Sequence, residues 1–175
     1  MGDRFSYEDH EGNRVYRYTK KLRKTDEGVV SLFKDIVVID EQGAVHSVPC
    51  VWSNADKLQQ TVLQENTSSE LNLDGTPKLR VDRVRLPMIG VYSNEIFMEG
   101  STPTVAYCVT VWSLFQEDMN QILEQIILKF DNKKNCKLKS ITRNHTAEDT
   151  LTIKVLQSML TLTVEGIGVP VETHE

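Results

Sequence analysis

The clearest hydrophobic pattern in the chain is a stripe of apolar residues at three- and four-residue steps, which is typical of an amphipathic helix. We expect this helix to start at Leu114, because Ser113 and Gln116 have the spacing of a capping box. Glu117 and Asp118 would lie in its first turn, where carboxylates interact favourably with the helix dipole. The apolar stripe comprises Met119, Ile122, Leu123, Ile126, Ile127 and Phe130. Burying these side chains contributes on the order of 10 kcal/mol before the entropy cost, so we expect the helix at the centre of the core.

Strand-like runs of β-branched and aromatic residues precede this helix. Residues 35–40 and 44–53 predict a β-hairpin, because Gly43 between them can supply the positive φ that a tight turn requires. Pro49 has no N–H group for a strand ladder, so the second strand should lie at an edge or leave the sheet at this point.

The remaining elements follow from the same periodicities. Further strands are expected at residues 78–92, 104–112 and 151–165. The first of these changes its apolar phase, which predicts a bulge near Asp82 and Arg83. Helices are expected at residues 13–34, with a break near Gly28 as an alternative, and at about 54–64. Polar composition predicts loops at residues 65–77, 93–103 and 131–144.

Strands and helices mixed in this order predict an α+β fold, layered as in α/β proteins, with a mixed β-sheet flanked by helices. The chain of 175 residues is long enough for one domain with a substantial core. We expect residues 1–12 to be a flexible polar segment and residues 13–175 to form a single domain.

Composition narrows the class of protein. An apolar content of 39% and a charged content of 26% are ordinary for a soluble globular protein, and no apolar run approaches membrane-spanning length. The N-terminus has no apolar signal-peptide region, and three scattered cysteines favour a reducing cytoplasm over a disulfide framework. The net charge of −5 argues against a dedicated nucleic-acid-binding protein, so no specific nucleic-acid partner is expected.

The polar residues form no catalytic pattern. The four histidines are scattered, and the chain has no His-Glu-x-x-His pair, phosphate-binding loop, Gly-rich dinucleotide turn or Gly-x-Ser-x-Gly elbow. The polar face of the predicted helix carries Glu117, Gln121, Glu124 and Gln125. No second acid or base is placed to make this face catalytic, so we interpret it as solvated or as a contact surface for a partner. We expect no catalytic, cofactor-binding or metal-binding residues.

Basic residues form two groups. The first group, on or beside a predicted strand, is Lys78, Arg80, Arg83 and Arg85. We interpret it as an interface for an acidic protein, with phosphate contacts to nucleic acid as the alternative. The second group is Lys133, Lys134, Lys137, Lys139 and Arg143. We interpret the second group, which lies in a predicted loop, as a solubility feature.

The order of these stretches resembles one family, the tail sheath stabiliser and tail-completion (tail terminator) proteins of contractile-tailed, T-even-type bacteriophages. The most specific stretch is YCVTVWSLFQEDMNQILEQIILKF, residues 107–130, in which a β-branched and aromatic strand enters the acidic and amide-rich helix. Earlier stretches, in family order, are residues 16–38 ending in LFKDIVV, then VPCVWSNADKL and RVRLPMIGVYS. The closing LTLTVEGIGVPV resembles the family's last strand and the turn after it, so the likeness spans most of residues 16–171.

This resemblance implies a structural protein of the virion rather than an enzyme. Such proteins form a ring, typically of six copies, at the head-proximal end of the tail. The ring ends polymerisation of tube and sheath, holds the extended sheath and presents a surface to the neck. The implied partners are further copies of the chain, the tail sheath protein, the tail tube or tube-terminator protein, and neck or head-completion proteins.

The resemblance also implies that the protein uses no cofactor and no membrane. It would be assembled in the cytoplasm of the host bacterium and end in the tail or neck of the virion. One alternative is another phage neck or baseplate adaptor with a related fold. An alternative from a different class is a nucleic-acid-binding module that uses the basic strand at residues 78–85.

Overall fold

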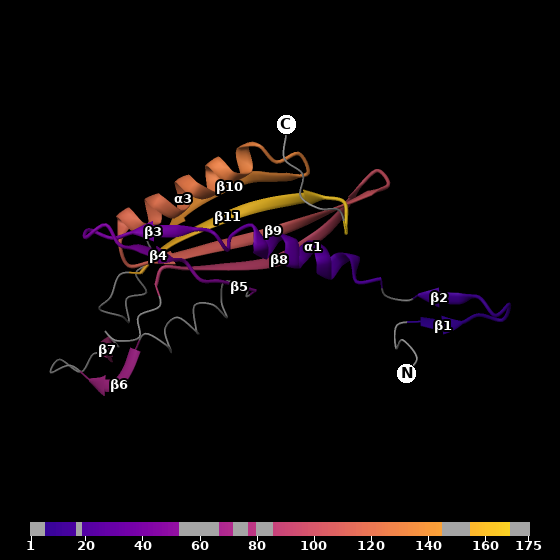
Figure 1. The fold of residues 1–175 in the computed structure, drawn as a ribbon, viewed down its shortest axis with the longest axis horizontal. Helices are drawn as coiled ribbons and strands as arrows, with labels where there is room; N and C mark the ends of the chain where they lie inside the picture. The colour runs from indigo at the N-terminus through magenta and orange to yellow at the C-terminus, as the bar shows by residue number, and fades with distance from the viewer. Residues whose placement is uncertain are drawn as a thin grey trace.

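A five-stranded mixed sheet, in the order β10-β11-β9-β8-β5, forms the centre of the molecule (Figure 1). The computed structural model describes residues 6–16, 19–52, 67–71, 77–79, 86–144 and 155–168. The strands are β5 (Cys50–Trp52), β8 (Met88–Glu99), β9 (Thr102–Ser113), β10 (Cys136–Asn144) and β11 (Leu156–Glu165). Neighbouring strands are antiparallel except β5 and β8, which are parallel. With helices α1 (Lys21–Ser31) and α3 (Gln116–Asp131), this arrangement confirms the expected α+β fold.

One hydrophobic cluster joins the sheet to both helices. Alternate residues of β9 point into it, and Val105, Tyr107, Val109 and Val111 are fully buried. α3 contributes the buried residues Met119, Ile122, Leu123, Ile126 and Phe130. After α1, the ring of Phe33 packs against that of Phe130 with centroids 5.6 Å apart. Because both helices contribute to the same cluster, they cover the same face of the sheet.

Three small antiparallel hairpins complete the described structure. They are β1 (Ser6–Glu8) with β2 (Arg14–Tyr16), β3 (Val37–Ile39) with β4 (Val45–Ser47), and β6 (Thr67–Leu71) with β7 (Pro77–Leu79). The β3–β4 hairpin confirms the prediction made from Gly43, which has a φ of 82° in its turn. After Pro49 the chain leaves this hairpin and enters β5 at the edge of the main sheet, which is one of the two expected outcomes.

The start of the helix predicted from residue 13 is wrong, because Arg14–Tyr16 is a strand and α1 begins only at Lys21. β1 likewise lies within the segment expected to be flexible. The carboxylate of Asp9 accepts hydrogen bonds from the backbone N–H groups of Glu11 at 3.0 Å and Asn13 at 2.8 Å. These bonds stabilise a tight turn, which competes locally with a helix. Gly28 lies inside α1, so the alternative of two short helices is also wrong.

Two segments predicted as loops are strands. The 93–103 loop is wrong because β8 continues to Glu99, and Gly100, with a φ of 66°, forms the turn into β9. A register shift between Ser93 and Glu95 interrupts the alternation that would have signalled the strand. The 131–144 loop is wrong because β10 occupies most of it, and a second register shift near Lys139 disrupts the pattern there as well. A bulge changes which residues share a face, so period-two counting fails across it.

The remaining predictions concern single short segments and residues. The 65–77 segment, expected to be a loop, contains β6 and the start of β7. The N-cap of α3 is Phe115 without a side-chain bond, so the Ser113–Gln116 capping box is wrong, and the Ser113 hydroxyl instead accepts the Phe115 N–H at 3.2 Å. Ile127 is 46% exposed and does not belong to the buried stripe. The helix predicted at about 54–64 and the bulge near Asp82 lie outside the described residues.

Candidate interaction site

Two glutamines of α3 hold the β3–β4 hairpin onto the helix. Gln121 accepts the N–H of Ile39 at 2.8 Å and donates to the carbonyl of the same residue at 3.0 Å. Gln125 repeats this exchange with Val37, at 3.2 Å and 2.7 Å. Four residues of a helix rise about 6 Å, and two residues of a strand rise about 6.6 Å, so the two spacings match. The side-chain amides therefore take the place that a neighbouring strand would have beside β3.

Because of this amide pairing, two of the four residues on the polar face of α3 are already bound within the chain. Of the four residues predicted as contacts, Gln121 and Gln125 bind the hairpin of their own chain. Glu124 is exposed on the helix, and Glu117 lies at its first turn. Participation of these four residues in an interface stays a prediction, and the accessible members of the set are the two glutamates.

A groove runs between the hairpin turn and the start of α3. Its volume is about 900 Å³, and its lining is Ile39, Asp40, Glu41, Gln42, Phe115, Gln116, Glu117, Asp118 and Gln121. The ring of Phe115 is 66% exposed, and Ile39 is 51% exposed. The lining combines exposed apolar side chains with carboxylates, and among the described residues it contains no lysine or arginine. Such a groove suits contact with a neutral or basic protein surface.

The carboxylates of this groove differ in their electrostatic environment. Asp40 accepts a bond from His46 at 2.7 Å, and this bond holds the pKa of the Asp40 carboxyl below its ordinary value. The pKa of Asp118 is raised, first by burial and then by the neighbouring charge of Glu117. A raised pKa means that the surroundings of Asp118 do not fully balance the negative charge of its ionised form. An approaching cation would stabilise that form.

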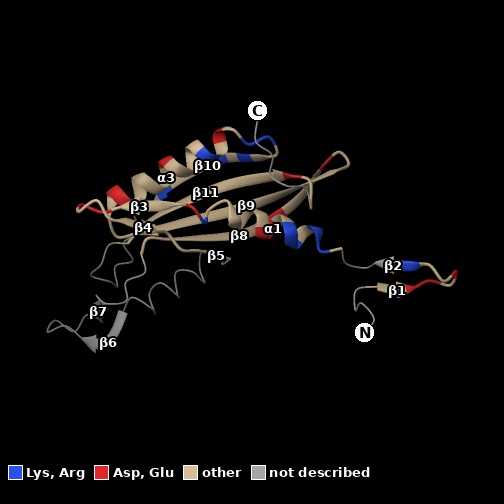
Figure 2. Ribbon diagram, viewed as in Figure 1, with Lys and Arg blue, Asp and Glu red and all other residues tan. Residues whose placement is uncertain are grey.

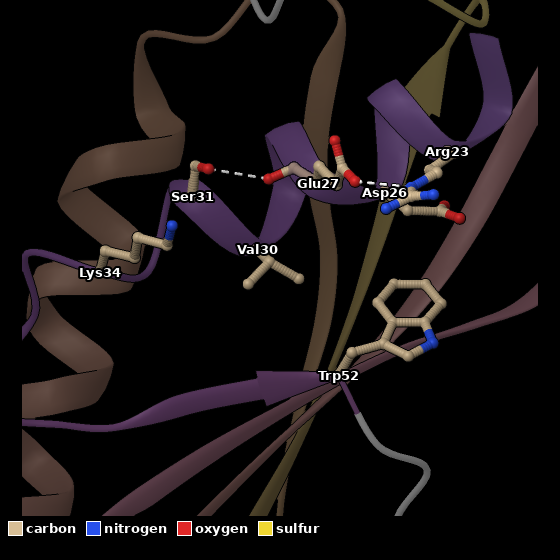
Figure 3. A pocket seen from close by; sticks show the side chains of 7 residues that line it. All are labelled: Arg23, Asp26, Glu27, Val30, Ser31, Lys34 and Trp52. Atoms are coloured by element: carbon tan, nitrogen blue, oxygen red, sulfur yellow. Dashed lines mark hydrogen bonds and ion pairs between the residues drawn. The ribbon is translucent and has the colours of Figure 1, made fainter. Parts of the chain in front are cut away.

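A second pocket of about 540 Å³ lies between α1 and the end of β5. It is lined by Arg23, Asp26, Glu27, Val30, Ser31, Lys34 and Trp52 (Figure 3). The indole of Trp52 lies beneath the helix, and Arg23 pairs with Glu27 at 2.8 Å along its surface. Trp52 also packs edge-on against the ring of Tyr107, with centroids 6.3 Å apart. The sequence gives no motif for this pocket, because α1 and β5 meet only in the fold.

Asp26 connects this pocket to the core. The hydroxyl of Tyr107 donates to the Asp26 carboxylate at 2.7 Å. Burial raises the pKa of Asp26 although this hydrogen bond acts in the opposite direction, and burial also raises the pKa of Tyr107. The pair satisfies the phenol of a fully buried tyrosine, so its first role is structural.

The basic residues lie in different parts of the molecule. Of the group predicted as an interface, Lys78 is in β7, its side chain is outside the described residues, and so are Arg80, Arg83 and Arg85. The lysines of the second group follow the end of α3 and lie along β10, away from the acidic groove at the start of the helix (Figure 2). Arg143, at the far end of β10, lies near the start of α3 instead. Within this group, Lys137 pairs with Glu165 at 2.9 Å, and Arg143 donates to Asn120 at 2.9 Å.

The described residues show no centre for metal or thiol chemistry. In this part of the chain, no three His, Cys, Asp or Glu residues are grouped so that they could hold a metal ion. Cys50 and Cys136 are free, and burial raises the pKa of each thiol to about 12, which keeps it protonated. Across the same residues, neither helix is long and apolar enough to cross a membrane.

No model of a protein family matches the sequence, and no curated protein matches it either.

Proposed function

We propose that the chain is a structural subunit of a contractile phage tail. It forms a ring at the head-proximal end, ends polymerisation of tube and sheath, stabilises the extended sheath and joins the tail to the neck. In this role it acts without catalysis or a cofactor. Its partners are other copies of itself in a ring of six, the sheath protein, the tube or tube-terminator protein and neck proteins, and its location is the tail or neck of the virion.

The observation that carries this proposal is the stretch at residues 107–130, the most specific part of the resemblance. In the fold this stretch is the central strand β9 followed directly by the core helix α3. The strand-to-helix passage on which the resemblance rests is therefore the architectural centre of the molecule. A sheet covered by helices is also the fold that the resemblance implies, which supports the proposal without being specific to it.

The surface chemistry supports a role in assembly. The groove at the start of α3 exposes Phe115 and Ile39 among carboxylates, and apolar side chains with a polar rim are typical of protein-protein contacts. The acidic groove lies at the start of α3, whereas lysines follow the end of this helix and continue into the beginning of β10 (Figure 2). Subunits of a ring need two different contact surfaces, because each copy meets two neighbours head to tail.

Labelling the protein on intact particles from its source tests the proposal. Gold-conjugated antibody, viewed by electron microscopy, should bind at the junction of head and tail, and an unrelated antibody serves as the control. Label at the distal end of the tail would favour a baseplate adaptor. Particles without label would overturn a role in the virion.

The nucleic-acid alternative depends on the basic strand at residues 78–85. It predicts DNA or RNA affinity that falls steeply with salt, because each phosphate contact releases counterions. Filter binding of a random duplex and a single strand at two salt concentrations measures this. Absence of salt-dependent binding would remove the alternative.

A further inference from the structure

Among the residues that the structure describes, the main sheet has two open edges. β5 pairs with β8 only from Ile89 to Val91, and no strand of the described residues pairs with the outer side of β8 from Tyr92 to Glu99. At the other side of the sheet, β10 pairs only with β11 within the described structure. An unpaired strand edge presents rows of N–H and C=O groups, so each edge is a template for another strand.

The two edges have opposite chemistry. The open part of β8 carries the exposed carboxylates Glu95 and Glu99 and no cation, and its Ile96 and Met98 are 50% and 61% exposed. β10 carries Lys137, Lys139 and Arg143, all exposed, and no carboxylate. Edge lysines discourage aggregation, which would explain β10 taken alone. The open edge of β8 is long and carries exposed apolar residues, which favours pairing with another strand. Protection against aggregation therefore does not explain the sequence of β8.

The register of the sheet relates the two edges to each other. Glu95 pairs with Ala106, Ala106 pairs with Thr163, and Thr163 pairs with Lys137. Directly paired residues point to the same face of a sheet. These four residues therefore form one row across the strands, with Glu95 at one end and Lys137 at the other. Three strand spacings of about 4.8 Å place them about 14 Å apart within one copy.

We propose that the open edge of β8 in one copy pairs with the edge of β10 in a second copy, with Glu95 beside Lys137 of the next copy. Three antiparallel steps separate β8 from β10, so the joined edges are antiparallel too. Copies that stand level, without a shift along the strands, bring the two ends of the shared row together.

In this register the joined rows run from Tyr92 beside Ser140 to Ile96 beside Cys136. β5 occupies the outer side of β8 from Ile89 to Val91, so β10 of the second copy turns away from the edge after Ser140. This contact uses two different surfaces, so it repeats from copy to copy, and it gives a ring when the rotation between neighbouring copies closes.

This inference rests on the proposed function, because it assigns the contact between neighbours in the proposed ring. The occupant is a second copy because the complementary charges lie on the two edges of the same sheet, in the same row. Lys137 already pairs with Glu165, but both side chains are about half exposed, at 51% and 43%. Exposed ion pairs contribute little free energy, so the lysine can exchange or share its partner at small cost.

A disulfide cross-link tests the contact directly. The double variant Glu95→Cys with Lys137→Cys cannot close a bond within one copy, since a disulfide requires Cα atoms within about 7 Å. Under mild oxidation we expect a ladder of linked chains on a non-reducing gel, ending at one discrete top band. The wild type controls for the native cysteines. Each single variant should give at most dimers, and Glu27→Cys with Lys137→Cys, which lacks the edge partner, should give no ladder.

Charge reversal provides a second, independent measurement. Glu95→Lys or Lys137→Glu places like charges across the contact, and we expect each to weaken self-association about fivefold in sedimentation experiments. Combining both substitutions in one chain restores opposite charges and should restore association. Circular dichroism checks that every variant is folded, and both side chains are exposed, so the fold should persist.

The outcomes separate this inference from the proposed function. A wild-type ring in solution without a Cys ladder, or with charge variants that associate normally, would overturn the edge contact and leave the tail role standing. A Cys ladder together with absence of label from phage tails would support the edge contact and overturn the tail role. A wild type that stays monomeric at every concentration and gives no ladder would overturn the contact.

Discussion

Gln121 and Gln125 show how side chains can complete a sheet edge. Each amide presents a C=O acceptor beside an N–H donor, which are the same two groups that a backbone residue presents to a neighbouring strand. Their spacing on α3 matches that of Ile39 and Val37 on β3, so both amides bind without distortion. β3 is consequently paired on both sides, by β4 and by the helix, and the hairpin is held on the body of the molecule.

Replacing Gln125 tests this role. Gln125→Ala removes both bonds to Val37 and leaves its backbone groups without these partners, and we expect a loss of about 1–3 kcal/mol in the free energy of unfolding. Chemical denaturation measures it. Glu124→Ala, at the adjacent exposed position, is the matched control and should change stability by less than about 0.5 kcal/mol. Equal effects of the two substitutions would contradict the role.

Asp26 predicts a dependence of stability on pH. Its pKa is raised above the ordinary 3.8, so the folded state holds this proton more tightly than the unfolded state does. Stability from this group is therefore present at low pH and is lost as pH rises from 3.8 through the raised pKa. Asp26→Asn keeps an acceptor for the Tyr107 hydroxyl and removes the charge.

We expect the Asp26→Asn variant to be more stable than the parent at pH 7, by less than about 1 kcal/mol after solvent screening. The difference should shrink as the pH is lowered towards 4. Thermal midpoints across this range measure it, with Glu124→Gln as the exposed control. A parent that is the more stable protein at pH 7 would show that the charged hydrogen bond from Tyr107 outweighs burial.

At the scale of elements, α3 is where sequence and packing agree best. Its first turn carries Glu117 and Asp118 and its last turn carries Lys129, which is the charge order that a helix dipole favours. Lys129 also donates to the Leu32 carbonyl at 2.6 Å and pairs with Asp35, so the end of the helix is tied to the chain after α1. The helix is thereby anchored at its C-terminal end and packed along its length.

Ile126 and Ile127 form a matched pair for testing this packing. They are adjacent residues of the same type, but Ile126 is fully buried and Ile127 is 46% exposed. Ile126→Ala should cost about 2–5 kcal/mol through lost burial and the cavity left behind, whereas Ile127→Ala should cost less than about 1 kcal/mol. Denaturant unfolding measures both. Comparable losses would mean that Ile127 is buried in a contact between copies.

Elements that carry the open edges were the hardest to predict. β8 and β10 both contain a register shift, and both combine charged with apolar residues. The composition of β10 and of β8 from residue 93 onward therefore indicated loops. The strand at residues 104–112 was predicted because β9 is paired on both sides, and such a strand is apolar through most of its length. Edge strands are hard to predict from sequence, because many of their positions are exposed to solvent and can be polar.

At the scale of the whole molecule, association between copies should appear in thermal stability. A native state that binds further copies is stabilised by mass action, so its melting temperature rises with protein concentration. We expect such a rise for the wild type and a smaller one for Lys137→Glu. Differential scanning calorimetry over a hundredfold concentration range measures it. A midpoint independent of concentration would contradict association of the folded chain.

The sequence by itself determined the α+β class, the core helix, the β3–β4 turn at Gly43 and the departure from that hairpin at Pro49. These features depend on local periodicity and on backbone limits of single residues, which neighbours in the chain already specify. The sequence also determined that the surface of α3 is rich in acidic and amide side chains.

Only the tertiary structure decided that Gln121 and Gln125 bind β3, that Asp26 meets Tyr107, and that Glu95 and Lys137 end one row of the sheet. The partners in these pairs are separated by 42 to 88 positions in the chain, and strand order and register determine which of them meet. A period of two or 3.6 residues carries no information about that order, because it depends on how the whole core packs.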